Sequence, residues 1–380
     1  MSKENKETQD VQEQIKKSNV EKIEKIKSAL ENLKEGKSKF LFCVPDSDQP
    51  SALLYEIYFH ANVVSGLGYE TYMMTETEEQ KVPEFIEKEL TEKIPHISMQ
   101  KSNISIGPED FMVISELHTN VMEQTKKLPC KRIGLLQSFD YMLNSVLPGV
   151  NWKSFGVTDV ITTSETLKNM LIKYYGKGFY NIKTYNIGIP DYFERTDKPQ
   201  KPIISLIGRN SNEMNKIIKL FYSKYPHFNW VTFDPMLTRK KPPQRLRRKD
   251  FANRLKENFA GVWIDRISSF GTFPLECMKT GTIPICLKPD ITPPYIHKDE
   301  EILENVGYWT INIYDLPEMI GDMLTKFLDD NIPDELYDGM YEKTLDYTPE
   351  KSKEMLNQVY VELIKERTSF MEEKIKEFEK

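Results

Sequence analysis

The segment Trp263 to Pro284 carries residue types and a spacing suited to binding a phosphorylated ligand. An apolar strand leads into a Ser-Ser-Phe-Gly-Thr loop, then into a helix that we expect to open near Pro274 and to stop at a glycine. Gly271 lets a backbone approach a ligand closely, and free N–H groups at the helix start would face a phosphate. Glu276, expected in the first helical turn, can accept hydrogen bonds from two vicinal hydroxyls, as on a ribose. The alternative is an ordinary strand-to-helix turn in which Glu276 only complements the helix dipole.

The order of residues in this segment resembles a known family. Retaining GT-B glycosyltransferases of family 4 carry the pattern E-S-F-G-x-x-x-x-E-A-M-x-x-G-x-P. The matching residues here are Ser269, Phe270, Gly271, Glu276, Met278, Gly281 and Pro284. The resemblance implies a nucleotide-sugar donor whose ribose binds Glu276, with the loop from Ser268 to Thr272 against the diphosphate or the sugar. It covers roughly residues 39–350, more strongly in the second half.

One position departs from the family pattern. Ser268 stands where the family has the first glutamate of its pair. A serine hydroxyl carries no charge, so a sugar contact usually made by a carboxylate is weakened or supplied elsewhere. The donor sugar is therefore left open, and an inactive relative that only binds is an alternative.

Gly208 and Arg209 form a second match, because the family places Gly-Arg after the first strand of its second half. A lysine follows there a turn and a half later, and Lys216 is its counterpart. The resemblance implies that both cations bind the donor diphosphate. A guanidinium fork and a point charge would stabilise the pyrophosphate as the glycosidic bond breaks. For Lys216, a solvated position on a helix face is the alternative.

Polar side chains that follow apolar runs in the first half are further candidates. Two acidic residues after the run at 39–44 would repel a diphosphate, so we expect Asp46 and Ser47 to face acceptor hydroxyls. His118, after the run at 110–115, is a candidate catalytic residue that contacts the donor sugar. The next apolar run is followed by candidates for the acceptor side, namely Gln137, Ser138 and Asp140. Plain loop or structural roles are the alternatives for all of these residues.

Apolar runs alternate with helical patterns along the chain, which predicts parallel, doubly wound sheets. The expected strands are 39–44, 69–74, 110–115, 132–137, 157–163, 203–208, 230–233, 261–265 and 283–287. Ligands of such sheets bind beyond the carboxyl ends of the strands. We therefore expect an α/β protein of GT-B architecture, with two Rossmann-like domains facing a cleft and helical extensions at both ends.

Four regions follow from this pattern. They are a charged helical extension at 1–37, an acceptor domain at 38–192, a nucleotide-sugar donor domain at 193–348, and a C-terminal helix crossing back at 349–380. Apolar residues recur at helical spacing in the first region, which is typical of a solvated helix or a docking helix. Helix-mediated self-association is therefore a candidate interaction.

Composition excludes several classes of protein. The net charge of −6 gives no general attraction to nucleic acid, and no apolar run approaches the ~20 residues that span a bilayer. The four cysteines lack paired spacing, which favours a reducing, cytoplasmic compartment. The basic segment Arg239 to Arg254 allows a DNA acceptor, with a solvated linker as the alternative. A composition rich in Lys, Glu and Asn is typical of a phage protein.

The sequence thus predicts a glycosyltransferase that moves a sugar from a nucleotide-diphosphate donor to a glycan, lipid or modified DNA base, with retention. No cofactor other than this co-substrate is expected. We expect no metal, because Asp-x-Asp occurs only as Asp46-Ser47-Asp48 and the order of elements is that of GT-B enzymes. The alternative is a catalytically inactive GT-B-like binding or scaffold protein.

Overall fold

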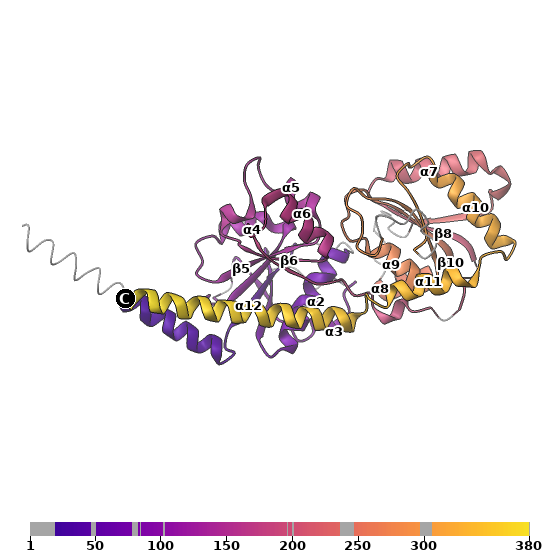
Figure 1. Cartoon of the computed structure of the whole chain (residues 1–380). Coiled ribbons are helices and arrows are strands. Elements are labelled where there is room, and N and C mark those ends of the chain that lie inside the picture. Colours follow the sequence, from indigo (N-terminus) through magenta and orange to yellow (C-terminus); the bar gives the residue numbers. More distant parts are fainter. Residues whose placement is uncertain are drawn as a thin grey trace, which may run out of the picture.

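The computed structural model describes residues 20–46, 51–77, 83, 85–101, 103–195, 197–199, 201–235, 247–296 and 306–379. Within these residues the strands form two parallel sheets, one in each half of the chain (Figure 1). Helices connect successive strands, so the two doubly wound domains expected from the sequence are present.

The first sheet has the strand order β3-β2-β1-β4-β5-β6-β7. Its strands are β1 (Lys39–Cys43), β2 (Glu70–Thr75), β3 (His96–Ser98), β4 (Phe111–Ser115), β5 (Lys131–Leu136), β6 (Asp159–Thr162) and β7 (Asn181–Thr184). The sequence does not predict the edge strands β3 and β7. Both are short and only partly buried, so neither has the continuous apolar run that marks a central parallel strand.

The second sheet has the order β12-β11-β10-β8-β9. Its strands are β8 (Lys201–Gly208), β9 (Thr232–Pro235), β10 (Asn258–Ile264), β11 (Ile283–Leu287) and β12 (Tyr308–Thr310). Strand order reverses between β8 and β10 here, and between β1 and β4 in the first sheet. Such switch points are where open α/β sheets bind ligands, in the crevice beyond the strand ends.

Helices of different lengths join the strands of the first domain. They are α2 (Ala52–Gly66), α3 (Lys88–Thr91), η1 (Glu116–His118), α4 (Thr119–Gln124), α5 (Phe139–Asn144), η2 (Trp152–Phe155) and α6 (Glu165–Tyr175). Ser51 caps α2 by accepting from the Leu54 N–H. Ser164 likewise caps α6 by accepting from the Leu167 N–H.

In the second half the helices are η3 (Asp191–Phe193), α7 (Ser211–Lys224), η4 (Pro226–Phe228), α8 (Arg248–Glu257), α9 (Thr272–Thr280), α10 (Leu316–Leu328), α11 (Asp334–Thr344) and α12 (Pro349–Phe378). Gly281 ends α9 in the left-handed region at φ 77°, as expected for a C-cap glycine. The start of α9 differs from the sequence-based expectation, because the helix begins at Thr272 rather than near Pro274. Glu276 therefore lies in the second turn.

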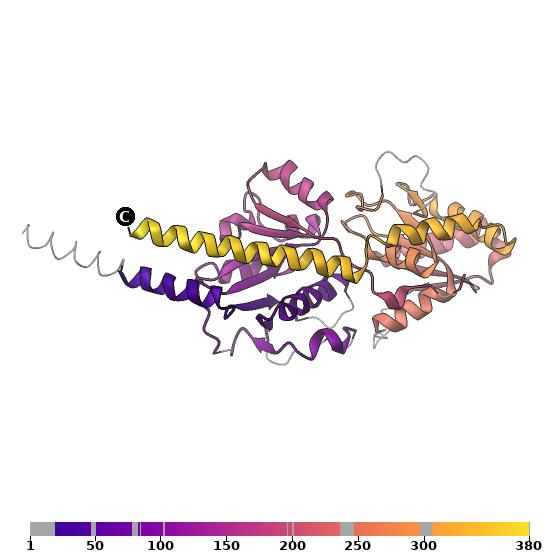
Figure 2. The ribbon, with the colours of Figure 1, turned by 60° about the horizontal axis from the view of Figure 1, so that its bottom comes forward.

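The C-terminal helix α12 returns to the first domain, where it runs along the side of the sheet (Figures 1 and 2). Lys183 of β7 forms ion pairs of 2.6 Å with both Glu362 and Glu366 of this helix. His60 of α2 is fully buried, and its Nδ1 lies 2.8 Å from the Tyr360 hydroxyl. The expected closing helix thus contributes to the core of a domain far from it in sequence.

A helix at residues 20–34 lies beside the distal end of α12 (Figure 2). Lys27 pairs with Glu379 and Lys34 pairs with Glu372, each at 2.7 Å between exposed side chains. Residues 1–19 of the predicted charged extension lie outside the described residues. Self-association through these helices stays a prediction.

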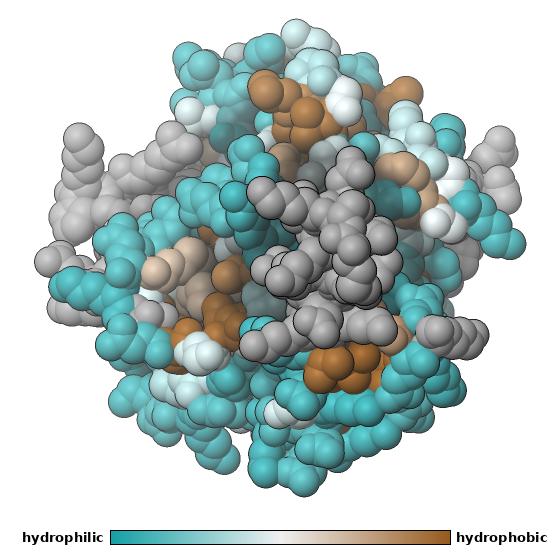
Figure 3. Space-filling model, turned by 90° about the vertical axis from the view of Figure 1, so that its left-hand side faces the viewer, coloured by the Kyte–Doolittle hydropathy of each residue, from teal (hydrophilic) through white to brown (hydrophobic). Residues whose placement is uncertain are grey.

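Hydrophobic residues in Figure 3 form separated patches on a mostly hydrophilic face at the first-domain end of the molecule. Among the described residues, every helix is too short or too polar to cross a membrane.

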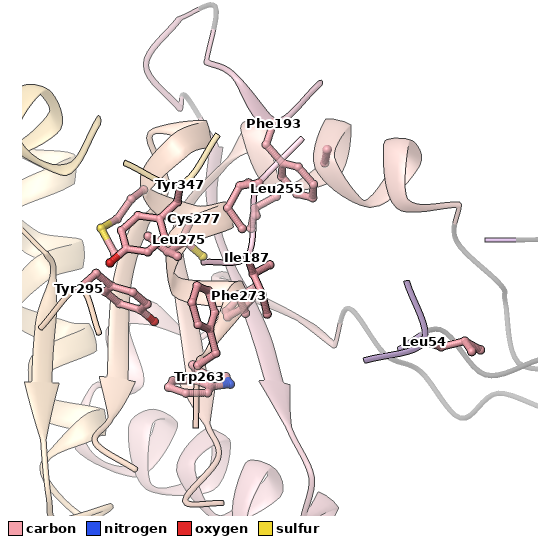
Figure 4. Packing of buried hydrophobic residues seen from close by; sticks show 14 of the residues in the cluster. Leu54, Ile187, Phe193, Leu255, Trp263, Phe273, Leu275, Cys277, Tyr295 and Tyr347 are labelled. Carbon is pink, nitrogen blue, oxygen red and sulfur yellow. The ribbon is translucent and has the colours of Figure 1, made fainter. Parts of the chain in front are cut away.

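The loop before α9 is fixed by close packing in the second domain, where Figure 4 shows Phe273, Ile187 and Trp263 gathered in one part of the core. Gly271 adopts φ +74°, a conformation that L-residues rarely take. A Cβ at this position would lie 2.7 Å from the Trp263 ring and 2.9 Å from the Tyr295 hydroxyl. Glycine is therefore required here both by backbone conformation and by space.

Candidate functional site

Loops at the carboxyl ends of β5 and β10 meet directly. The Ser138 hydroxyl donates to the Ile267 carbonyl oxygen at 3.2 Å, and the Phe139 N–H donates to Ser269 Oγ at 3.3 Å. Ser138 and Ser269 are both nearly fully buried. Two groups of candidate residues from opposite halves of the sequence are therefore brought together at the domain interface.

Glu116 holds the first-domain side of this contact. Its Oε1 accepts from the N–H groups of Gln137 at 3.2 Å and Ser138 at 2.9 Å. Complete burial raises the pKa of Glu116 to about 8, although these backbone donors favour the charged form. The sequence-based candidates omit Glu116, yet an acidic residue immediately after a fully buried strand is a signal that could have identified it.

Arg209 lies at the switch point between β8 and β10. Its Nε donates to Asp265 Oδ2 at 2.6 Å, and its Nη1 hydrogen-bonds to the hydroxyl of Tyr141 in α5. Its guanidinium also stacks over the Tyr141 ring, 5.1 Å from the centroid. Arg209, which the resemblance predicts to bind the diphosphate, therefore lies at the junction of the two domains. About two fifths of its side chain is exposed.

Asp265 is a second residue that sequence reasoning missed. Its Oδ1 accepts from the N–H groups of Ile267 at 3.0 Å and Ser268 at 3.1 Å, while its Oδ2 binds Arg209. The resemblance implies that loop amides here meet a phosphate or a sugar. In this structure the protein's own carboxylate occupies the amides at 267 and 268, because Asp265 ends the strand that leads directly into the loop.

The first turn of α9 keeps its own anion-binding potential. Its N-cap is Gly271, which offers no side chain to cap the free N–H groups, and Thr272 is the first helical residue. Glu276 lies beyond this turn, so the alternative in which it only complements the helix dipole is weakened, since that effect falls off within one turn.

Glu276 instead forms a buried ion pair. Arg248 Nη2 donates to Glu276 Oε1 at 2.8 Å, with side chains that are 10% and 8% exposed. Burial raises the pKa of Glu276, and the Arg248 guanidinium opposes that rise. The carboxylate that the resemblance assigns to the ribose is therefore held by an arginine.

Arg248 also contacts the first domain. Its guanidinium lies 4.0 Å from the centroid of the Tyr55 ring in α2 and 5.7 Å from that of Phe193 in η3. The sequence-based interpretation placed Arg248 in a basic segment facing DNA or solvent, and for this residue it is wrong, because packing of α8 buries it. Arg254 of the same helix pairs with Asp234. Residues 239–246 of the segment lie outside the described residues.

Among the described residues, the two other predicted catalytic residues form no hydrogen bond or ion pair with Arg209. Lys216 is exposed on α7, and its ammonium lies 5.4 Å from the centroid of the Tyr314 ring. No contact among the described residues joins it to Arg209. His118 is buried, with Nε2 at 3.7 Å from Glu76 Oε1. Burial lowers the pKa of His118, and the nearby Glu76 carboxylate opposes this change.

Asp140, another predicted residue, interacts electrostatically with Asp265 and Arg209 at the junction. Burial and the neighbouring Asp290 and Asp265 carboxylates raise its pKa, whereas Arg209 lowers it. Asp46 is used locally, since its two oxygens accept from the N–H groups of Glu76 at 3.0 Å and Thr77 at 2.8 Å. Ser47 lies outside the described residues.

Other predicted site residues, from both the donor and the acceptor side, have structural roles. Phe270 packs in the core against Tyr347, with centroids 5.8 Å apart. Gly208 ends β8, where a Cβ would lie 3.1 Å from the Ile264 carbonyl oxygen. The Gln137 side chain donates to the Leu53 carbonyl oxygen at 3.0 Å. Within the described ranges, no three His, Cys, Asp or Glu side chains are grouped so that they could hold a metal ion.

Comparison with solved structures identifies the architecture. Sucrose-phosphate synthase from Thermosynechococcus elongatus aligns with a TM-score of 0.58 and 13% identity, over 86% of this chain and 99% of that one. A glycosyltransferase from Rickettsia africae ESF-5 aligns with a TM-score of 0.55 and 14% identity, over 87% and 98%. An apo structure of OtsA aligns with a TM-score of 0.55 and 8% identity, over 86% and 99%. The chain has the GT-B fold.

The GT-B assignment rests on structure, because the chain matches no protein-family model and no curated protein sequence. At these identities the alignments establish the arrangement of the two domains and not the chemistry. In that arrangement the Arg209, Asp265 and Ser269 positions lie where the two GT-B domains meet, on the carboxyl side of both sheets.

Proposed function

We propose that the protein transfers a sugar from a nucleotide-diphosphate sugar to an acceptor hydroxyl or base, with retention at the anomeric carbon. One observation carries the proposal: Arg209 lies at the β8/β10 switch point, beside the loop that docks on Ser138 and Phe139. Switch points are the binding regions of open α/β sheets, and a guanidinium fork suits a diphosphate. The GT-B fold and the family pattern of residues 263–284 support the same activity.

In this mechanism Arg209 transfers part of its contact from Asp265 to the donor diphosphate. The uncapped N–H groups at the start of α9 provide a second set of donors for the same anion. Negative charge accumulates on the diphosphate as the glycosidic bond breaks, so fixed donors aimed at it lower the barrier. Lys216 would add a mobile charge from the exposed face of α7.

Glu276 binds the donor ribose through its carboxylate in this proposal. We assign the acceptor side to the first-domain residues Asp140, Ser138 and Gln137, with Asp46 further from the junction and His118 toward the donor sugar. The transfer requires no cofactor and no metal ion. The acceptor is a glycan, a lipid or a modified DNA base. Cysteine spacing and composition support a cytoplasmic, phage-encoded enzyme, and the residue pattern of 263–284 supports family 4.

The proposal is tested with UDP-, GDP-, ADP- and dTDP-linked sugars, measured by thermal stabilisation and by slow donor hydrolysis. We expect one donor to stabilise the wild type and to be hydrolysed by it, and Glu276→Ala to lose both effects. Lys219→Ala, an exposed change on α7, is the matched control and should keep both. The proposal would be refuted if no donor binds, or if Glu276→Ala binds the donor as well as the wild type does.

A binding or scaffold protein with this fold is the second candidate. Two observations favour it: Ser268 replaces the family's first glutamate, and Asp265 already occupies both Arg209 and two loop amides. Such a protein would bind a donor without turnover. Donor stabilisation with no hydrolysis and no transfer to any acceptor fraction would support this candidate over the enzyme.

A further inference from the structure

We propose that Arg248 is a positioning residue, which keeps the Glu276 carboxylate ionised and oriented for a donor ribose and couples it to the first domain through Tyr55. The inference rests on the proposed function, since it concerns the same donor site. Neither the family pattern nor the sequence-based candidates assign Arg248 such a role.

The first support is the geometry of the ion pair. Arg248 Nη2 and Glu276 Oε1 are 2.8 Å apart, and about nine tenths of each side chain is buried. A carboxylate buried to this extent without a partner takes up a proton instead of keeping its charge. A protonated Glu276 would offer a ribose one acceptor fewer, so the charge on this group matters for binding.

The second support is the set of groups around the pair. The Tyr55 ring of α2 lies against the guanidinium, which also interacts electrostatically with Glu56 of α2 and with Tyr192 of η3. Tyr192 donates to Glu87, and Tyr295 interacts electrostatically with Glu276. Among these described groups all but Arg248 are acidic or neutral, and Lys279, one turn along α9 from Glu276, pairs with Asp191 instead. Burial raises the pKa of Glu56 to about 7, and the Arg248 charge opposes that rise too. Arg248 is thus the cation that offsets the carboxylates of this cluster.

The third support is the contact with the first domain. The Arg248 guanidinium lies 4.0 Å from the Tyr55 ring centroid, and Tyr55 is 7% exposed. A planar guanidinium can stack on a ring and donate to a carboxylate at the same time, which an ammonium does less well. The orientation of Glu276 therefore depends on a residue of the opposite domain.

A competing account is that Arg248 occupies the ribose position and blocks it. The two accounts predict opposite changes in donor affinity when Arg248 is replaced. If Arg248 organises Glu276, its removal weakens donor binding in a pH-dependent way. If Arg248 blocks the site, its removal strengthens donor binding at every pH.

The experiment measures donor affinity by calorimetry from pH 5 to 9, with the nucleotide sugar that stabilises the wild type. The variants are Arg248→Gln, Arg248→Lys, Glu276→Gln and, as a control on the same helix, Arg254→Gln, which removes the ion pair with Asp234. Circular dichroism checks folding, and Arg248→Lys retains the positive charge if Arg248→Gln does not fold.

Without Arg248 the pKa of Glu276 rises further, so its ionised form is present only above that higher pKa and is lost as pH falls through it. We expect Arg248→Gln to bind the donor about tenfold more weakly than the wild type at pH 7, and to recover affinity as pH rises. Arg248→Lys should recover at a lower pH. Glu276→Gln should bind weakly with no such recovery, and Arg254→Gln should follow the wild type.

An Arg248→Gln profile that matches the wild type, or tighter binding at every pH, would overturn the inference. Carbon NMR of the Glu276 carboxyl, without donor, separates this failure from failure of the proposed function. A higher titration midpoint in Arg248→Gln, together with no donor binding to any variant, would retain the ion-pair role and reject the function. An unchanged midpoint would reject the inference regardless of donor binding.

Discussion

The backbone N–H of Phe139 donates a hydrogen bond to Ser269 Oγ at 3.3 Å, across the interface between the two domains. Phe139 opens α5 in the first domain, and Ser269 lies in the loop that precedes α9 in the second. Because Glu116 fixes the residue before Phe139, this contact connects the interior of one domain to the candidate donor loop of the other.

Replacing Ser269 with alanine removes the acceptor of the Phe139 N–H. A buried donor left without a partner costs about 1–3 kcal/mol. We expect the free energy of unfolding, measured by urea titration, to decrease by an amount in that range. Donor affinity should decrease as well. Ser223→Ala, at an exposed hydroxyl of α7, is the control and should change stability by less than about 0.5 kcal/mol. Equal effects of the two changes would count against the interface role.

Glu116→Gln tests the buried carboxyl. Its pKa is about 8 in the folded protein against an ordinary value of 4.5, so the folded state binds more protons than the unfolded state between these values. The stability of the wild type should therefore decrease with rising pH across that window because of this group. We expect the variant to gain stability relative to the wild type from pH 5 to pH 8 in urea titrations. A difference that is constant with pH would contradict the assignment.

Gly271→Ala tests the shape of the loop before α9. The change adds backbone strain at φ +74° and a clash with Trp263 and the Tyr295 hydroxyl. Strain contributes roughly 1–2 kcal/mol and overpacking roughly 1–3 kcal/mol, so thermal unfolding should move clearly to lower temperature. Gly68→Ala is the matched control, since it has φ +93° with nothing within 4 Å of the new Cβ. It should show the strain without the clash.

Arg209→Ala should reduce turnover far more than Lys216→Ala. Arg209 sits at the switch point and contacts both domains, whereas Lys216 is exposed and contacts Tyr314. Loss of one fixed donor to a developing negative charge costs about 10²–10³-fold in kcat. We expect an effect of that size for Arg209→Ala in donor hydrolysis, and one below about tenfold for Lys216→Ala. A larger loss of turnover in Lys216→Ala than in Arg209→Ala would indicate that the diphosphate binds near α7 instead.

The sequence by itself determined the central strands, most of the helices that connect them and where the loops between them fall. Fully buried runs such as Phe111–Ser115 identify central parallel strands, because both faces of such a strand are covered and nearly every residue is apolar. Gly281 marks the end of α9, and the length of α12 is enough for its return to the first domain. These features depend on neighbours along the chain, which a sequence pattern records directly.

Only the tertiary structure decided which side chains meet. Arg248 reads in sequence as part of a charged, solvated segment, yet it is buried between Tyr55 and Glu276, residues contributed by α2 and α9. Glu116 likewise meets the Gln137 and Ser138 amides, and Asp265 meets Arg209, only because the fold brings these segments together. A charged residue becomes part of a site when distant elements remove it from water and supply its partner. That pairing depends on packing between elements, so the spacing of residues along the chain does not predict which side chains become partners.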